Sequence, residues 1–286
     1  MITSAFSLSM PETRSSSVVF ASPHSGREYS AGFLTQSVLD DVTIRSSEDA
    51  FVDQLFADAP SFGAPLLMAT APRAYVDLNR SPDELDPALI KGIRTVSHNP
   101  RIVSGLGVVP RVVANGRCIY RGKLSLDDVQ GRLRRCWQPY HDQLSSLLAD
   151  SHAQFGEAIL IDCHSMPHEA LDSVARTMPC RPEVVLGDRF GASASREVMD
   201  MLEAAFTAEG LRVVRNVPFA GAYTTQHYGR PSRNQHVVQV EIDRSLYMNE
   251  QLIRPNGNFK AMKAAMNRVI AKVTEFGQPK QRLAAE

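Results

Sequence analysis

The chain has 286 residues, and its 31 lysines and arginines balance 31 aspartates and glutamates, so the formal net charge at pH 7 is zero. Hydrophobic residues make up 43% and charged residues 22% of the sequence, which is typical of a globular protein with a full core. A neutral chain argues against a nucleic-acid partner, because that binding depends on surplus basic residues that neutralise phosphates.

Membrane and disulfide signals are also missing from the sequence. The chain contains no run of about 18 apolar residues and begins with no charged segment followed by a long apolar one, so we predict a cytoplasmic protein without a membrane span. Cys118, Cys136, Cys163 and Cys180 form no CxxC pair, which favours four free thiols. No pattern in the sequence specifies an oligomeric state.

Apolar runs and polar turns alternate through the first part of the chain. The β-rich run 18–22 ends in Pro-His-Ser-Gly, which predicts a strand followed by a loop. Residues 46–49 begin a predicted helix over 50–56, and a second strand is expected over 65–71. Residues 73–80 alternate polar and apolar side chains, which favours a half-buried extended segment.

Residues 81–116 are rich in proline, glycine and asparagine, which predicts long loops with short strands around 111–114. Ser125 is expected to cap a long amphipathic helix that extends to about Leu148, with a kink at Pro139. The nearly continuous apolar run 158–163 is typical of a central strand covered on both faces.

Five further elements are predicted in the second half of the chain. They are a strand at 184–187, a helix with apolar residues from 198 to 206, a strand at 211–214, a strand at 236–242 and a helix from about 258. The segment 221–229 between them is expected to be a polar loop bounded by glycines. This alternation predicts an α/β fold, and we expect residues 1–286 to form a single domain.

Two histidines, His24 and His164, each directly follow a predicted strand, and ligands of α/β proteins collect at strand ends. Two neutral imidazoles and a carboxylate would form a catalytic zinc site with an open position for water, and Glu48 and Asp49 are the nearest carboxylates. A single histidine more often only hydrogen-bonds within a turn, so the spacing leaves both interpretations open.

Glu241 stands inside the apolar strand 236–242, where a carboxylate without a partner would be costly to bury. Beside a metal-bound water it could act as general base, although strand alternation could instead turn it to solvent. Arg80 offers a planar fork of donors suited to a carboxylate substrate, but an isolated arginine more often closes a strand with a surface salt bridge.

Several segments together resemble the N-formylglutamate amidohydrolase family, from about residue 18 to 272. They are 22–26 (SPHSG), 75–80 (YVDLNR), 162–165 (DCHS), 221–229 (GAYTTQHYG) and 239–242 (QVEI). The resemblance implies a three-layer α/β/α fold with a mixed central sheet, similar to zinc carboxypeptidases and of the phosphorylase/hydrolase-like type. It also implies one Zn²⁺ per chain and hydrolysis of N-formyl-L-glutamate to formate and L-glutamate in histidine degradation, with Glu241 as base and proton shuttle.

By the same resemblance, His24 and His164 are zinc ligands and an acidic residue between them is the third. Relatives with this fold commonly place that acid three residues after the first histidine, but Arg27 stands there in this sequence. The short acidic motif of the family, which precedes a helix, aligns best with Asp49 and leaves Glu48 as the alternative ligand.

A substrate with two carboxylates needs more than one cationic clamp. Asn79 with Arg80 is the first choice, by resemblance to the asparagine–arginine pair that holds the terminal carboxylate in carboxypeptidases. Arg73 and Arg121 are candidates for the second carboxylate. His227 lies in a loop that could reach the site, where it could support a ligand or have a purely structural role.

Other interpretations stay open at this point. The chain could be a zinc amidohydrolase that acts on another small N-acyl amino acid or dicarboxylate, or a metal-dependent binding protein without turnover, although Glu241 is retained. A cysteine hydrolase using Cys163 and His164 is disfavoured, because neighbours along a strand point to opposite faces. The ligand set favours zinc, but iron, cobalt or manganese can occupy such ligands.

Overall fold

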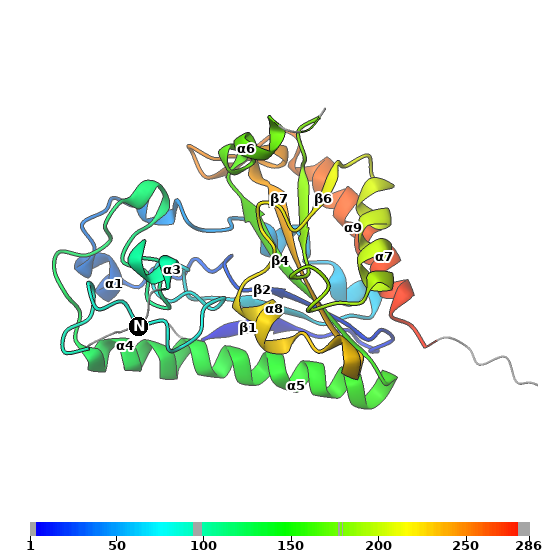
Figure 1. The fold of residues 1–286 in the computed structure, drawn as a ribbon, viewed down its shortest axis with the longest axis horizontal. Coiled ribbons are helices and arrows are strands. Elements are labelled where there is room, and N and C mark those ends of the chain that lie inside the picture. The colour runs from blue at the N-terminus through cyan, green and yellow to red at the C-terminus, as the bar shows by residue number, and fades with distance from the viewer. Residues whose placement is uncertain (1–3, 94–98, 177, 179, 280–286) are drawn as a thin grey trace, which may run out of the picture.

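A seven-stranded mixed sheet forms the centre of the computed structural model, which describes residues 4–93, 99–176, 178 and 180–279 (Figure 1). In spatial order, its strands are β1 (Phe6–Ser9), β3 (Leu66–Ala69), β2 (Val18–Ser22), β4 (Ala158–Met166), β7 (Gln235–Asp243), β5 (Val184–Gly187) and β6 (Val213–Arg215). Strands β3, β2, β4 and β7 are parallel, whereas β1 pairs antiparallel with β3 and β5 with β7. The predicted α/β fold with a mixed sheet is confirmed.

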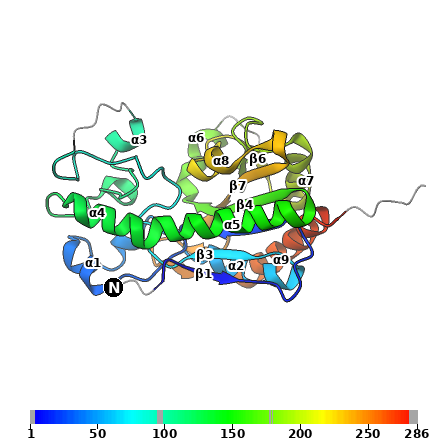
Figure 2. The same cartoon turned by 90° about the horizontal axis from the view of Figure 1, so that it is seen from below.

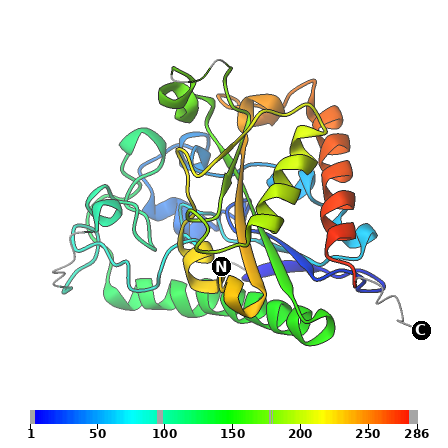
Figure 3. The ribbon, with the colours of Figure 1, turned by 45° about the vertical axis from the view of Figure 1, so that its right-hand side comes forward.

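Helices cover both faces of this sheet, as Figure 2 shows. Helix α5 (Gln138–Phe155) packs its apolar side on one face, and α2 (Val52–Leu55), α7 (Arg196–Thr207) and α9 (Phe259–Phe276) pack on the other. In Figure 3, α7 and α9 lie side by side. The first half of β4 is apolar on both sides, and its alternate residues face the two cores, which is the expected pattern for a buried parallel strand.

The remaining elements are short and lie mostly around the edges of the sheet. They are α1 (Ala31–Gln36), α3 (Pro100–Val103), α4 (Leu126–Arg132), α6 (Asp172–Ala175), α8 (Tyr223–Tyr228), the 3-10 helices Thr43–Arg45, Ala59–Phe62, Ala114–Gly116, His168–Leu171, Pro231–Arg233 and Arg244–Leu246, and the hairpin strands β8 (Met248–Asn249) and β9 (Arg254–Pro255). Within the described ranges, no helix is both long enough and apolar enough to cross a membrane.

The long helix predicted from Ser125 is present, and the Ser125 side chain accepts a hydrogen bond from the Asp128 backbone N–H at 3.2 Å. Between α4 and α5 the chain forms a π-helical turn over Leu133–Trp137, just before Pro139, where we expected a kink. A π turn there changes the backbone register at the position where proline supplies no N–H.

Several sequence-based expectations about secondary structure are wrong. Residues 73–80 form turns rather than an extended segment, and around 111–114 the structure has only an isolated bridge between Val112 and Cys118. The helix expected over 50–56 is shorter in the structure, where α2 begins only at Val52, because Phe51 has a left-handed backbone with φ of 67°. Strand β1 was not expected, and part of the long-loop prediction, residues 94–98, lies outside the described residues.

Two corrections concern the site. Strand β4 continues to Met166, so His164 lies within the strand rather than after it. The segment 221–229, expected to be a loop, contains helix α8. The polar sequence of this segment gives no helical pattern, and contacts with the rest of the protein stabilise the helix. In its first turn, the Thr224 backbone N–H donates to Asn79 Oδ1 at 2.8 Å.

A third group of buried apolar residues lies beside the sheet and surrounds a fully buried arginine, Arg132. Its guanidinium donates to Tyr75 O at 3.1 Å, Tyr120 Oη at 2.6 Å, Gln36 Oε1 at 2.9 Å and Asp128 Oδ2 at 2.9 Å. The guanidinium carbon also lies 4.3 Å from the centre of the Tyr75 ring. These contacts tie α4 to the segment that carries the turn at 73–80.

We expect Arg132→Met to lower the free energy of unfolding by about 3 kcal/mol, because it leaves the buried Tyr120 hydroxyl and the partly buried Asp128 carboxylate without their donor. Arg134→Met, two residues along at an exposed position, is the control and should shift it by less than about 0.5 kcal/mol. Guanidinium-chloride unfolding followed by circular dichroism measures both. Equal denaturation midpoints for the two variants would contradict the structural role of Arg132.

Candidate metal centre

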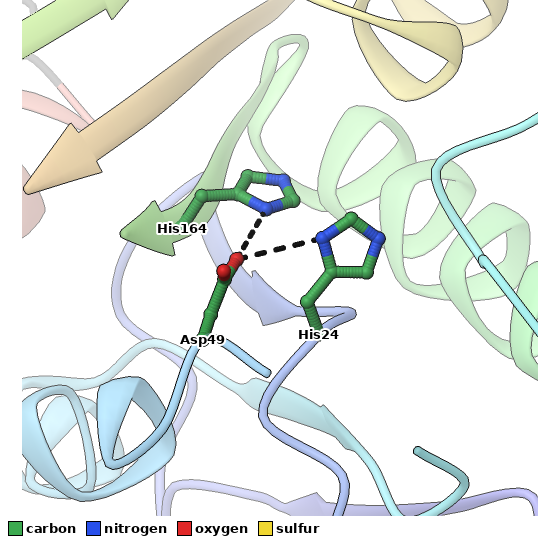
Figure 4. Close-up of side chains that lie close together, drawn as sticks. All are labelled: His24, Asp49 and His164. Atoms are coloured by element: carbon green, nitrogen blue, oxygen red, sulfur yellow. Dashed lines mark hydrogen bonds and ion pairs between the residues drawn. The ribbon is translucent and has the colours of Figure 1, made fainter. Parts of the chain in front are cut away.

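Three buried side chains, His24, Asp49 and His164, converge at one edge of the sheet (Figure 4). Asp49 Oδ2 lies 3.4 Å from His24 Nδ1 and 2.9 Å from His164 Nδ1. The three atoms that could serve as ligands all lie within 4.8 Å of one another. Two imidazole nitrogens and a carboxylate oxygen at this spacing could hold a metal ion.

The fold brings these residues together from three separate segments. His24 stands on the turn after β2, and His164 lies in β4, which pairs in parallel with β2. Asp49 precedes α2, and its backbone N–H donates to the carbonyl of His24 at 3.0 Å. A second bond, from Arg244 Nη2 to Asp49 Oδ1 at 2.9 Å, holds the other carboxylate oxygen. The orientation of Asp49 is therefore set before any ion binds.

A carboxylate stands behind each histidine. His24 Nε2 lies 2.7 Å from Asp77 Oδ1, and His164 Nε2 lies 3.1 Å from Asp162 Oδ2. If each Nε2–H donates to its carboxylate, each Nδ1 presents a lone pair to Asp49, as metal-binding histidines commonly do. Nδ1 of His24 is buried and has no hydrogen-bond partner. Such an arrangement of lone pairs and a carboxylate calls for a cation between them, so the residues fit a metal ion.

Asp49, rather than Glu48, is the carboxylate that meets the histidines. Burial alone would raise the pKa of Asp49, but the adjacent imidazoles of His164 and His24 more than offset that effect and hold the pKa well below its usual value. Glu48 is occupied elsewhere: Arg45 contacts both of its oxygens at 3.0 Å, and the Tyr29 hydroxyl donates to it at 3.2 Å.

Glu241 lies beside the metal centre and is not turned to bulk solvent. In β7 it pairs in register with His164 of β4, and its side chain is buried where it lines the cleft. Gln239 Nε2 donates to Glu241 Oε1 at 2.8 Å. Burial raises the pKa of Glu241 to about 7, although the charge of His164 opposes the shift. The carboxylate can therefore exchange a proton near neutral pH.

Asn79 is close to the site, but its amide is engaged with the protein. Its Nδ2 donates to Asp162 Oδ2 at 3.2 Å and Gln239 Oε1 at 3.3 Å, while its Oδ1 accepts from the Thr224 backbone. Because Asp162 supports His164, Asn79 positions a candidate ligand. Asn79 also lines the cleft, so its expected contact with substrate stays a prediction.

The cleft next to Glu241 has a volume of about 790 Å³. Arg73 and Arg80 line it, as expected of substrate-binding residues. Arg121 does not, because it lines a separate cavity near Tyr120 and Asp128. His227 is also outside the lining of this cleft: it lies exposed on α8 and stacks on Tyr223, with ring centres 4.9 Å apart.

Sequence reasoning missed two arginines that line the cleft, Arg101 and Arg244. Arg244 directly follows the strand that carries Glu241, and a cation at that strand end was the available signal. Arg101 lies in α3, within a segment whose weak periodicity offered no signal.

Cys163 points away from the site. It belongs to the apolar core on the opposite face of β4 from His164, and burial raises the pKa of its thiol well above the ordinary value. The predicted opposite orientation of these neighbours is confirmed, which removes the geometric basis for a cysteine hydrolase.

A buried pair of histidines, a carboxylate that completes a metal site and a further carboxylate facing the same cleft are features of metal-dependent hydrolases. The sequence profile of the N-formylglutamate amidohydrolase family matches residues 16–248. The chain therefore belongs to the N-formylglutamate amidohydrolase family, and the resemblance of the five segments is confirmed. It is a hydrolase of that family.

Individual relatives agree with this assignment. The chain is 30% identical over 237 residues to an N-formylglutamate deformylase of Pseudomonas aeruginosa, covering 82% of this chain and 83% of the relative. A deformylase of Pseudomonas putida is 30% identical over 240 residues, with 82% of each chain covered. The sequence relatives thus span most of the chain.

Solved structures show the same fold. The crystal structure of an N-formylglutamate amidohydrolase from Ralstonia eutropha superimposes with a TM-score of 0.89 at 32% identity, covering 95% of this chain and 98% of that one. A protein from Agrobacterium tumefaciens gives a TM-score of 0.66 at 16% identity, with 96% and 95% covered. The latter likeness shows a shared fold alone.

We expect purified protein to bind about one divalent metal ion per chain. Loss of a carboxylate that only supports a ligand typically costs about 10- to 100-fold in metal affinity, so Asp49→Ala should cost more than about 100-fold. Glu48→Gln, at the neighbouring acid, is the matched control and should retain the ion. Elemental analysis after dialysis against a weak chelator measures both, with circular dichroism to confirm folding. Metal retained by Asp49→Ala but lost from Glu48→Gln would show that Glu48, and not Asp49, is the acidic metal ligand.

Proposed function

We propose that this chain hydrolyses N-formyl-L-glutamate to formate and L-glutamate, with one Zn²⁺ held by His24, Asp49 and His164. The observation that supports this most is the convergence of both Nδ1 atoms on one Asp49 oxygen, beside a cleft lined by Glu241. Two imidazoles and a carboxylate suit zinc, and the Pseudomonas relatives are N-formylglutamate deformylases.

The chemistry divides between the ion and Glu241. When bound, such an ion supplies Lewis acidity, which lowers the pKa of water and polarises a carbonyl oxygen. Glu241 accepts a proton from the water whose oxygen attacks the formyl carbon. It then returns that proton to the amide nitrogen as the carbon–nitrogen bond breaks, because an unprotonated amine leaves poorly. Formate and L-glutamate are the products, and no bond to the enzyme forms.

The surroundings of Glu241 keep it in place for both transfers. Gln239 Nε2 holds one carboxylate oxygen at 2.8 Å, which leaves the other free to reach the cleft. The same glutamine accepts hydrogen bonds from Asn79 Nδ2 and from the backbone N–H of Ala222 at 3.0 Å. The base therefore belongs to the hydrogen-bond network that also supports His164.

Arg80 is the best-placed clamp for one substrate carboxylate. Its side chain lines the cleft, and its hydrogen bonds go to the carbonyls of Leu106 at 3.1 Å and Asn79 at 3.2 Å. These bonds orient the guanidinium without neutralising its charge. Arg73 is less available, because its Nε lies 3.1 Å from Asp77 Oδ2.

We expect Glu241→Gln to lower kcat on N-formyl-L-glutamate by about 10²- to 10⁴-fold, because glutamine can neither accept nor deliver the proton. Metal content should stay unchanged, since Glu241 is not one of the three proposed ligands. Glu169→Gln, at an exposed position on the 3-10 helix His168–Leu171, is the matched control and should keep full turnover. Amine release from the zinc-loaded proteins measures the effect. Full turnover by Glu241→Gln would remove the proposed base.

The same site could act on another small N-acyl amino acid, because the metal chemistry is indifferent to the side chain. The cleft volume of about 790 Å³ also leaves room for a longer acyl group. We expect kcat/KM for N-formyl-L-glutamate to exceed that for N-acetyl-L-glutamate and for N-formyl-L-leucine by at least about tenfold, because an acetyl carbonyl is less electrophilic than a formyl carbonyl and leucine lacks the second carboxylate. Initial rates on these three compounds decide the point, and a preference for either competitor would transfer the function to that substrate class.

A further inference from the structure

We infer that Arg101 is a specificity-determining residue that binds the side-chain carboxylate of the substrate, while Arg80 binds the carboxylate next to the cleaved amide. This inference rests on the proposed function, which calls for a substrate with two carboxylates. It assigns the second clamp to a residue that sequence reasoning did not consider, in place of Arg121.

The arginines of the cleft differ in how their charges are balanced. Arg73 and Arg244, which lie next to the metal centre, are paired with the carboxylates of Asp77 and Asp49 at 3.1 Å and 2.9 Å. Neither has a full charge to offer to a ligand. Binding of a dianionic substrate must therefore depend on the cations that line the rest of the cleft.

Arg80 is one such cation. Its hydrogen-bond acceptors are backbone carbonyls, and its own carbonyl accepts from Trp137 Nε1 at 2.9 Å, so both ends of the residue are fixed. The guanidinium has five N–H groups, of which Leu106 and Asn79 occupy two, so the remaining donors can face a ligand. Its position next to Asn79 places it on the metal side of the cleft.

Arg101 is the other such cation, and it lies in α3 on the lining of the cleft. Within the ranges that the structure describes, its guanidinium has no hydrogen-bond or ion-pair partner. Two acids of the segment before α3 have other partners: Asp86 pairs with Arg111 Nε at 2.8 Å, and Glu84 accepts from Asn99 Nδ2 at 3.3 Å. The charge of Arg101 is thus available to a ligand.

Arg80 and Arg101 also influence each other through their charges. Burial lowers the pKa of Arg80 and Asp77 opposes that effect, while the charge of Arg73 and, to a smaller degree, that of Arg101 add to it. Two guanidinium groups that share one cleft repel each other, and an anion bound between or across them relieves that repulsion. Leu106, which is 36% exposed and also lines the cleft, gives the methylene groups of a glutamate side chain an apolar contact.

The test compares N-formyl-L-glutamate with N-formyl-L-glutamine, which has nearly the same shape but no side-chain charge. We expect Arg101→Met to lower kcat/KM on the glutamate compound by about 10- to 100-fold, mainly through KM, because a charge-assisted hydrogen bond is lost. On the glutamine compound the change should stay within about twofold to threefold. Arg101→Lys should restore part of the loss, and Arg134→Met is the control. Equal losses on both compounds, or no loss on either, would overturn the inference.

A binding measurement separates this inference from the proposed function. Calorimetric titration of zinc-loaded Glu241→Gln with each compound reports affinity without turnover. If the wild-type protein does not hydrolyse N-formyl-L-glutamate, the proposed function fails. Arg101→Met in the Glu241→Gln background should still weaken binding of the glutamate compound by about 10- to 100-fold and spare the glutamine compound. If the affinity ratio of the two compounds does not change, Arg101 does not select the side chain, even where wild-type turnover is normal.

Discussion

The carboxylate of Asp49, buried between two imidazole nitrogens, is the constraint around which the rest of the cleft is arranged. One of its oxygens faces His24 Nδ1 and His164 Nδ1, and the other is held by Arg244. In a buried environment, lone pairs and a negative charge cannot remain this close without a compensating cation. The fold must therefore provide both the geometry that gathers these groups and the hydrogen bonds that keep them in the form that binds metal.

Much of the local structure provides the hydrogen bonds that keep the histidines and Asp49 in the form that binds metal. Asp77 and Asp162 fix the Nε2 side of each histidine, and Asn79 connects Asp162 to helix α8 through the Thr224 backbone N–H. The chain turns at 73–80, and there Asp77 faces His24 while Asn79 faces Asp162. In the same way, β4 carries polar residues beyond its apolar half because its C-terminal end forms the floor of the site.

The parts of this site that were predictable from sequence are those that a regular strand places. His24, His164 and Glu241 stand at or near the C-terminal ends of apolar runs, which places them at one edge of a parallel sheet. That β2, β4 and β7 are neighbours in the sheet is not given by the order of the runs in the sequence. The family resemblance favoured Asp49 over Glu48, but the residue pattern alone could not decide between them, because the choice depends on Arg45, which pairs with Glu48. Helix α8 was missed since its stability comes from tertiary contacts rather than from its own sequence pattern.

The cleft also separates the chemistry from the recognition of substrate. Near the metal centre, each arginine is paired with an aspartate, so binding a dianionic substrate there would compete with the bonds that orient the ligands. By contrast, Arg80 is oriented only by carbonyl groups and Arg101 lies on a short helix, so a bound carboxylate need not disturb the histidines or Asp49. A substitution at Arg101 can then change which acyl amino acid binds while the proton transfer by Glu241 remains intact. This separation would allow one metal centre to serve different substrates within the family, because selectivity lies in residues that do not support the ligands.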